Sequence, residues 1–384
     1  MTARWDIFCK VVDNFGDAGV AWRLARQLSQ EHSLAVRLWI DDPRSLVRMS
    51  PGVDASQDRQ FHAGIELRRW RETFAEPAPA DADVVVEAFG CGLPEAYMNA
   101  MTRRSPAPVW FVLEYLSAES WIDGGHGLPS PHPKLPLTRR FWFPGFTPAS
   151  GGLLRERGLL ESRDAFQRGA RARADFWSSL SVPDSAAGEC RVSLFCYPHP
   201  ALPALLDAWA DGDDAVSCVV PDGVATGALD AWTGGNVPHA GRPLSRGRLT
   251  LHAIPFLSQE TYDRLLWACD VNFVRGEDSF VRAQWAARPF VWHIYPQANE
   301  AHRRKLDAFV NRYAAALEPP EATAVRRIFH VWNGVAGAEG MDDAWRSFAA
   351  ARPAIAQHAA AWSRQLAALP ELASGLVKAS LDRI

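Results

Sequence analysis

The sequence predicts an α/β protein with two parallel, doubly wound sheets. Short runs rich in β-branched and aromatic residues alternate with helical patterns, which is typical of successive βα units. This alternation begins at residue 5 and starts again near residue 191. The chain has 384 residues, more than one ordinary hydrophobic core holds, so two domains are expected.

The first half contains five predicted strands. They cover residues 5–12, 33–40, 65–70, 83–87 and 108–113. The first helix begins near Asp17, because Val20, Leu24 and Leu28 then form one apolar stripe. Residues 126–148 contain six prolines, so we expect an irregular surface loop or a lid there. A long charged helix is expected over residues 152–180.

The second half repeats the pattern. Its strands are expected at residues 191–196, 216–220, 249–254, 271–274 and 290–294, with a long loop at 222–247 and helices at 201–210, 299–317 and 342–369. Ser258 is expected to cap a further helix, with Glu260 and Thr261 in its first turn.

Composition excludes several classes of function. The net charge is −3, and no cluster of arginines exceeds two residues, so nucleic acid is not an expected partner. The six cysteines are scattered without a CxxC pair, which indicates reduced thiols and neither disulfides nor a zinc site. No apolar run approaches the roughly 20 residues of a membrane span, and no signal peptide is seen, so we expect a cytoplasmic protein without a membrane partner.

The loop after the first strand carries two acidic residues. Asp13 and Asp17 lie four residues apart in Asp13-Asn14-Phe15-Gly16-Asp17, at the carboxyl end of a strand and the start of a helix, where open α/β folds bind ligands. Two carboxylates there can act as a general base or stabilise a cation. In the alternative interpretation, Asp17 caps the helix and Asp13 only forms a turn.

A second turn has a similar arrangement. Arg275-Gly276-Glu277-Asp278-Ser279 follows a strand and begins a helix whose backbone N–H groups can bind phosphate. Arg275 would offset the charge of a diphosphate, and Glu277 or Asp278 would accept hydrogen bonds from sugar hydroxyls. Alternatively, Asp278 or Ser279 caps the helix and Arg275 pairs with a neighbouring acid.

Aromatic side chains at other strand ends of the second half suit a planar base. Phe195, Tyr197, Phe256 and Leu257 could hold it by stacking, and Gln259 follows them; ordinary packing is the alternative. The acidic run at 211–214 lies between a helix and a strand and is interpreted as a solvated turn, so no metal site is expected. The histidines show no spacing that indicates a nucleophilic triad.

Three segments together carry a family resemblance. FCKVVDNFGDAGVAWRLARQL, VRGEDSFVRAQWA and FVWHIYPQ resemble the bacterial protein-arginine rhamnosyltransferases that modify elongation factor P, and the similarity extends over nearly the whole chain. The resemblance implies a GT-B fold, with two Rossmann-like domains facing each other across a cleft. It also implies a dTDP-β-L-rhamnose donor, inversion at the anomeric carbon, no cofactor or catalytic metal, and activation of elongation factor P for ribosomes stalled at polyproline.

The resemblance also assigns domains. It implies an N-terminal acceptor-binding domain over residues 1–152, joined by a C-terminal helix at 360–384, a linker helix at 153–182, and a donor-binding domain over 183–359. The implied catalytic residues are Asp13, Asp17 and Glu277. The resemblance implies Arg275, Gly276, Asp278 and Ser279 as donor-binding residues. Further candidates for donor binding are Asn14, Phe15, Gly16, Phe195, Tyr197, Phe256, Leu257 and Gln259.

Roles for these residues follow from the chemistry of arginine. Its guanidinium has a pKa above about 12, so it must be oriented and lose a proton as the C–N bond forms. Our hypothesis makes Asp17 the base, with Asp13 orienting the guanidinium and Glu277 fixing the donor. Two other functions stay open: a GT-B glycosyltransferase with another acceptor, and a non-catalytic protein that binds a nucleotide sugar.

Overall fold

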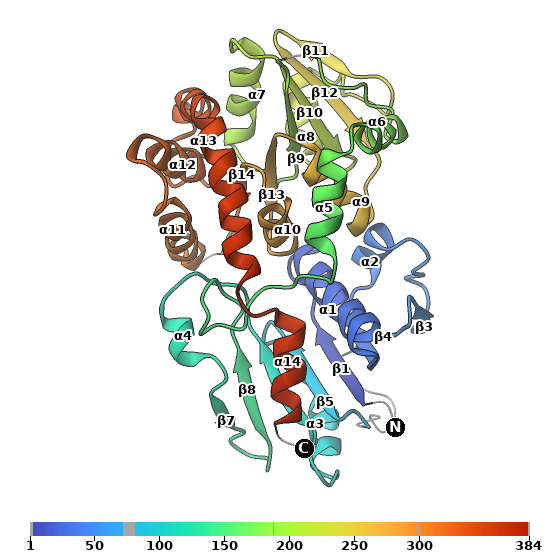
Figure 1. Ribbon diagram of the computed structural model, residues 1–384. Helices are drawn as coiled ribbons and strands as arrows, with labels where there is room; N and C mark the ends of the chain where they lie inside the picture. Colours follow the sequence, from blue (N-terminus) through green and yellow to red (C-terminus); the bar gives the residue numbers. More distant parts are fainter. Residues whose placement is uncertain (1–2, 72–80, 187, 298–299, 383–384) are drawn as a thin grey trace. The chain divides into compact units, whose positions relative to one another are not determined.

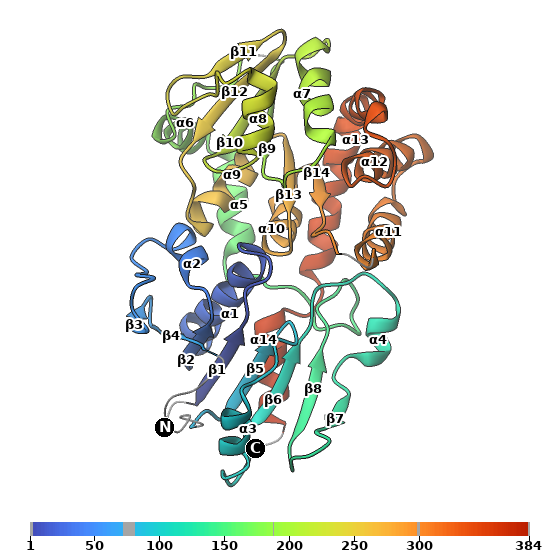
Figure 2. The ribbon, with the colours of Figure 1, turned by 180° about the vertical axis from the view of Figure 1, so that it is seen from behind.

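The computed structural model describes residues 3–71, 81–186, 188–297 and 300–382. The chain divides into two compact units, shown in Figures 1 and 2. Residues Met1–Arg157 and Ala367–Ile384 form the N-terminal unit, and residues Gly158–Leu366 form the C-terminal unit. Each unit is an α/β domain that contains one β-sheet and its own hydrophobic core.

The N-terminal unit contains a sheet with the strand order β3-β4-β2-β1-β5-β6-β8-β7. Its strands are β1 (Arg4–Cys9), β2 (Ala35–Ile40), β3 (Arg59–His62), β4 (Ile65–Arg69), β5 (Val84–Ala88), β6 (Val109–Leu113), β7 (Pro129–Pro131) and β8 (Thr138–Trp142). The first strand, β1, pairs in parallel with both β2 and β5. The direction of winding therefore reverses beside β1, and such a switch point is where open α/β sheets bind ligands.

Helices cover both faces of this sheet. They are α1 (Gly16–His32), α2 (Arg44–Met49), α3 (Glu95–Met101), α4 (Trp121–Gly125) and α14 (Leu372–Leu381). Figures 1 and 2 show α14 beside α1 on one face and α3 on the other. Leu24 and Leu28 of α1 are fully buried, as their spacing predicts. On the α3 side, Tyr97 packs edge-on against Phe8 of β1 with ring centroids 4.7 Å apart.

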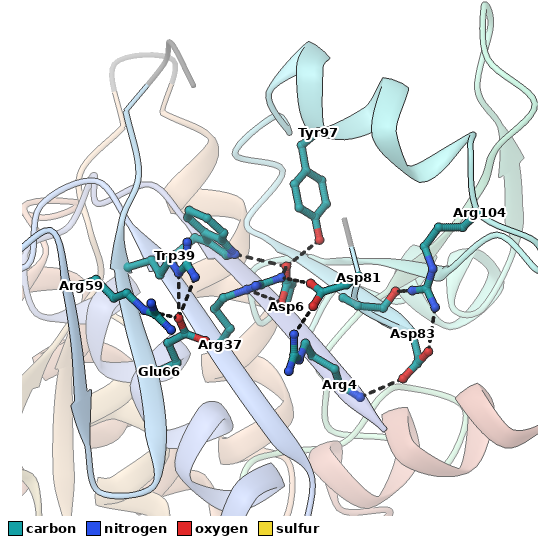
Figure 3. A network of polar contacts seen from close by, with 12 residues as sticks. Arg4, Asp6, Arg37, Trp39, Arg59, Glu66, Asp81, Asp83, Tyr97 and Arg104 are labelled. Atoms are coloured by element: carbon teal, nitrogen blue, oxygen red, sulfur yellow. Dashed lines mark hydrogen bonds and ion pairs between the residues drawn. The ribbon is translucent and has the colours of Figure 1, made fainter. Parts of the chain in front are cut away.

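A buried polar network joins β1, β2 and α3 (Figure 3). The guanidinium of Arg37 donates to both carboxylate oxygens of Asp6, at 2.9 and 2.6 Å, and also to Asp81 at 2.8 Å. Tyr97 donates its hydroxyl to Asp6 at 2.6 Å. Burial alone would lower the pKa of Arg37, but the hydrogen bonds and charges of Asp6 and Asp81 raise it above its ordinary value. The network thus connects β1 to β2 and α3.

The C-terminal unit contains a sheet with the order β11-β12-β10-β9-β13-β14. Its strands are β9 (Cys190–Leu194), β10 (Val216–Pro221), β11 (Leu244–Arg246), β12 (Leu249–Ile254), β13 (Val271–Arg275) and β14 (Phe290–His293). Strand β9 pairs in parallel with β10 and β13, so this sheet has its own switch point beside β9. Both halves are therefore doubly wound sheets with mostly parallel strands, as predicted, and the edge strands β3, β7 and β11 are antiparallel to their neighbours.

The helices of this unit are α5 (Leu159–Arg168), α6 (Ala170–Ser179), α7 (Ala201–Asp211), α8 (Thr226–Thr233), α9 (Gln259–Ala268), α10 (Asp278–Ala286), α11 (Ala301–Ala314), α12 (Pro319–Trp332) and α13 (Met341–Ala367). Figure 1 shows α5 in front of the sheet, and Figure 2 shows α8 on the opposite face. Ser258 caps α9 as predicted, because its hydroxyl accepts the N–H of Thr261.

Several predicted elements are wrong. The single linker helix at 153–182 is two helices, α5 and α6, because Gly169 interrupts it with an extended backbone, and both belong to the C-terminal unit. The C-terminal helix at 360–384 is divided between the end of α13 and the separate helix α14. The proline-rich segment 126–148 contains β7 and β8, and the predicted loop 222–247 contains α8 and β11. Helix α12 is absent from the prediction.

Candidate functional site

The acidic loop follows β1 at the switch point of the N-terminal sheet. Helix α1 begins directly after it, at Gly16, and its N-cap residue is Phe15. Asp17 therefore lies inside the first turn and does not cap the helix, so the capping interpretation is wrong. Its carboxylate turns back toward the loop instead. Oδ2 accepts the backbone N–H groups of Val12 and Asp13, both at 2.8 Å.

Asp13 occupies a position that only glycine at residue 16 permits. A β-carbon added to Gly16 would lie 2.3 Å from Oδ2 of Asp13, well inside van der Waals contact. The side chain of Asp13 thus lies directly over the start of α1, where the helix dipole favours negative charge. Asp13 is 7% exposed and Asp17 is 1% exposed. The loop holds two carboxylates largely shielded from water.

Burial changes the acidity of this loop. It raises the pKa of Asp17 from its ordinary value near 3.8 to about 6. Hydrogen bonds from the backbone of Asp13 and Val12, and from the side chain of Tyr115, oppose this shift, whereas the charge of Asp13 adds to it. A carboxyl group that titrates near neutral pH is suited to take a proton from a substrate.

Two residues from neighbouring strand ends also support the loop. Asp41, which follows β2, accepts the N–H of Val11 at 2.8 Å. Tyr115, which follows β6, bonds to Asp17. Neither residue is among the predicted site residues, although an acid directly after the second predicted strand is a usable signal for Asp41. The consecutive N–H groups of residues 11, 12 and 13 are thus all bound by carboxylates.

The second predicted turn follows β13 at the switch point of the C-terminal sheet. Gly276 has a φ of +62°, the left-handed conformation that favours glycine. Ser279 bonds back to Arg275, with its Oγ accepting the N–H at 3.0 Å and donating to the carbonyl oxygen. Glu277 is the N-cap residue but makes no capping side-chain bond. Neither Asp278 nor Ser279 caps α10, so the capping part of that interpretation is wrong.

Arg275 contacts two of the predicted aromatic residues. Its guanidinium carbon lies 4.7 Å from the ring centroid of Phe195 and 4.4 Å from that of Tyr197. These residues follow β9, the strand beside β13. Arg275 and Glu277 are partly exposed, whereas Gly276, Asp278 and Ser279 are buried. Cation–π contacts with these two rings therefore help to hold the Arg275 guanidinium at the strand ends.

The remaining predicted residues lie at the start of α9. Gln259 donates to Asp278 at 3.2 Å, so it connects α9 to the second turn. The rings of Phe256 and Phe195 lie 6.3 Å apart. Leu257 is 8% exposed and packs in a hydrophobic cluster with Trp177 and Leu265. Next to these residues, Arg282 of α10 forms a buried two-bond ion pair with Asp263 of α9, at 3.0 and 2.7 Å.

The structure thus groups the predicted residues into two sets. Asp13, Asn14, Phe15, Gly16 and Asp17 form one set in the N-terminal unit, and the other residues gather at neighbouring strand ends in the C-terminal unit. Within the described ranges, no three His, Cys, Asp or Glu side chains form a group that could hold a metal ion. None of the helices in those ranges has the length and apolar character needed to span a membrane.

Comparison with known proteins agrees with this architecture. A family model described as elongation factor P (EF-P) rhamnosyltransferase EarP matches residues 5–380. A protein-arginine rhamnosyltransferase of Pseudomonas putida is 48% identical, with 98% of each chain covered. Its counterpart from Pseudomonas aeruginosa is 45% identical, with 99% of each covered.

Solved structures give the same result. A structure described as the basis for EarP-mediated arginine glycosylation of EF-P is 37% identical, with a TM-score of 0.69 and both chains fully covered. MurG of Acinetobacter baumannii is 12% identical, with a TM-score of 0.54 over the whole of both chains, a likeness of fold alone. The predicted GT-B fold is confirmed. The chain belongs to the EarP family of elongation factor P rhamnosyltransferases.

Proposed function

We propose that this protein transfers rhamnose from dTDP-β-L-rhamnose, with inversion, to one arginine of elongation factor P. The observation that carries the proposal is the pair of buried aspartates, Asp13 and Asp17, at the switch point of a chain that matches the EarP family over residues 5–380. The sugar donor, the stereochemistry and the residue roles are the parts that experiment must establish.

The acidic loop suits the arginine acceptor. A guanidinium is a cation, and two shielded carboxylates attract and orient it. The loop is poorly suited to a diphosphate, because the N–H groups of residues 11, 12 and 13 already donate to Asp41 and Asp17. This charge and hydrogen-bond arrangement supports the assignment of Asp13 and Asp17 to the acceptor.

The second turn suits the nucleotide sugar. The N-terminus of α10 and the guanidinium of Arg275 both favour negative charge, which a dTDP diphosphate carries. Glu277 and Asp278 can accept hydrogen bonds from sugar hydroxyls, and the rings of Phe195 and Phe256 can contact the thymine base. Arg275 and the helix end would stabilise the departing dTDP without help from a metal.

The proposed reaction balances as a single displacement. A guanidinium nitrogen of the acceptor attacks the anomeric carbon, and a C–N bond forms as the C–O bond to the diphosphate breaks. The carboxylate of Asp17 takes the proton that the nitrogen loses, and dTDP leaves with the bonding electron pair. Attack opposite the leaving group converts the β-donor into an α-linked product.

A rate and stereochemistry experiment tests the proposal. Initial rates are measured with elongation factor P and dTDP-β-L-rhamnose, UDP-glucose or GDP-mannose, each with and without EDTA. We expect transfer from dTDP-β-L-rhamnose alone, at a rate that EDTA leaves unchanged, and an α-anomeric NMR signal in the product. A β-linked product, or equal rates with UDP-glucose, would overturn the donor and inversion assignments.

A further inference from the structure

Three strand ends of the N-terminal unit meet beneath the acidic loop. We propose that Tyr115 is a positioning residue for the transfer reaction, in which its hydroxyl holds the carboxylate of Asp17 and Phe89 fixes its ring. The inference rests on the proposed function and adds two residues to it. Neither residue touches the reacting atoms in this proposal, because both act through Asp17.

The hydroxyl of Tyr115 completes a set of donors around one carboxylate. Asp17 accepts the N–H groups of Val12 and Asp13 from its own loop. The Tyr115 side chain adds a hydrogen bond from a different part of the chain, in which the hydroxyl donates and the carboxylate accepts. The Tyr115 hydroxyl is therefore a third donor to a carboxylate that otherwise accepts two backbone N–H groups of its own loop.

The ring of Tyr115 is itself held in place. It lies nearly parallel to the ring of Phe89, with centroids 4.5 Å apart and planes inclined by 18°. Phe89 directly follows β5 and Tyr115 lies two residues after β6, and these strands and β1 are consecutive in the sheet. The carboxyl ends of the three strands therefore bring Asp17, Tyr115 and Phe89 together.

Phe89 has an unfavourable backbone conformation. Its φ is +59°, in the left-handed region that a bulky aromatic residue rarely adopts, and its N–H donates to the carbonyl of Leu113 at 2.6 Å. Such a conformation is energetically unfavourable for a residue that has a side chain. Glycine would adopt it freely, and Gly90 and Gly92 nearby do so. The phenyl ring of Phe89, which glycine would lack, makes the stacking contact with Tyr115.

The hydrogen bond also tunes the base. A donor to the charged form opposes the rise in the pKa of Asp17 that burial causes. The other titratable groups that act on Asp17 are Asp13 on the same loop and Cys9 at the end of β1, while Asp41 binds the loop at Val11. None of these groups donates to the Asp17 carboxylate, so among the residues that the structure describes Tyr115 is the side-chain donor that favours its ionised state.

The first test is Tyr115→Phe, which removes the hydroxyl and keeps the stacked ring. We expect kcat to fall about tenfold, with the KM for dTDP-β-L-rhamnose unchanged. The acidic limb of the pH–kcat profile should move up by about one pH unit, because the ionised carboxylate has lost a donor. Tyr313→Phe is the matched control, since the buried hydroxyl of Tyr313 has no hydrogen-bond partner within the described ranges.

The second test asks whether Phe89 acts through Tyr115. Phe89→Gly removes the ring and suits the left-handed backbone, so the fold should persist, as a thermal melt will show. We expect kcat to fall several-fold, and Phe89→Gly combined with Tyr115→Phe to be no slower than Tyr115→Phe alone. Additive losses would contradict the positioning role of Phe89.

Two outcomes would overturn the proposal for Tyr115. One is a Tyr115→Phe variant whose kcat and acidic limb match the wild type. The other is an unchanged acidic limb with a raised KM for elongation factor P, which would make Tyr115 an acceptor contact. Both outcomes can be measured only if the wild-type enzyme transfers rhamnose. Absence of transfer by the wild type would instead defeat the proposed function, so the two failures are distinguishable.

Discussion

Asp17 combines near-complete burial with a charge that the proposed chemistry needs. Its pKa of about 6 means that it is mostly ionised at pH 7 and becomes protonated as the pH falls below 6. A general base works only in its ionised form. We therefore expect kcat to be nearly constant above pH 7 and to fall about tenfold for each pH unit below 6.

Substitution of the same residue tests its role as the base. Asp17→Asn keeps the size of the side chain and can still accept the N–H groups of Val12 and Asp13. We expect kcat to fall at least about 100-fold, whereas the Kd of dTDP-β-L-rhamnose by calorimetry stays within about twofold of the wild type. Loss of donor binding in this variant would contradict the assignment of Asp17 to the acceptor.

Gly16 is the subject of a third prediction at the scale of single residues. In Gly16→Ala the new methyl group would displace the carboxylate of Asp13, since the two would lie 2.3 Å apart. A displacement of about 1 Å in a reactive group can cost 100-fold in rate, so we expect kcat to fall about 10- to 100-fold with the fold intact. Gly227→Ala in α8 is the matched control, because no atom lies within 4 Å of its added carbon. Equal activity of the two variants would rule out this role for Gly16.

At the scale of elements, much of the βα pattern could be predicted because strands buried on both faces are continuous apolar runs. The failures have physical causes. Strand β8 lies between Pro136 and Pro144. The prolines of this segment predicted irregular structure, but these two lie outside the strand, one before it and one after it. Asp41 and Tyr115 reach the acidic loop because β2 and β6 are close to β1 in the sheet. The periodicity of apolar residues predicts individual strands but not their order in the sheet, so these contacts could not be predicted from the sequence.

The turn after β13 tests the donor side at the same scale. Arg275→Lys keeps the positive charge but loses the flat guanidinium that lies against Phe195 and Tyr197. We expect the KM for dTDP-β-L-rhamnose to rise about tenfold and kcat to change less. Arg246→Lys is the control, because Arg246 lies 4.5 Å from the ring of Trp232 away from the strand ends that carry the proposed site. A fall in kcat at constant KM would contradict donor binding by Arg275.

At the scale of the whole molecule, stability and activity should be separable. Asp6→Asn weakens the buried partner of Arg37 while leaving both proposed sites chemically intact. Breaking a buried ion pair costs about 3–5 kcal/mol, so we expect a clearly lower melting temperature, measured by calorimetry. At temperatures where the variant is folded, its kcat should match the wild type. A low kcat in the folded variant would show that the network also shapes the acidic loop.

Membership of the EarP family rests on similarity along nearly the entire chain. The proposed function rests on two groups of residues, one in the acidic loop and one at the strand ends of the C-terminal unit. Motif length made the family recognisable from the sequence, whereas burial, pKa and hydrogen bonding of the aspartates required the fold.

The most direct test is the mass of elongation factor P after incubation with this protein and dTDP-β-L-rhamnose. We predict the addition of one deoxyhexose, located on a single arginine by fragmentation, and no addition with Asp17→Asn. Unmodified elongation factor P in the presence of a folded, donor-bound protein would contradict the account.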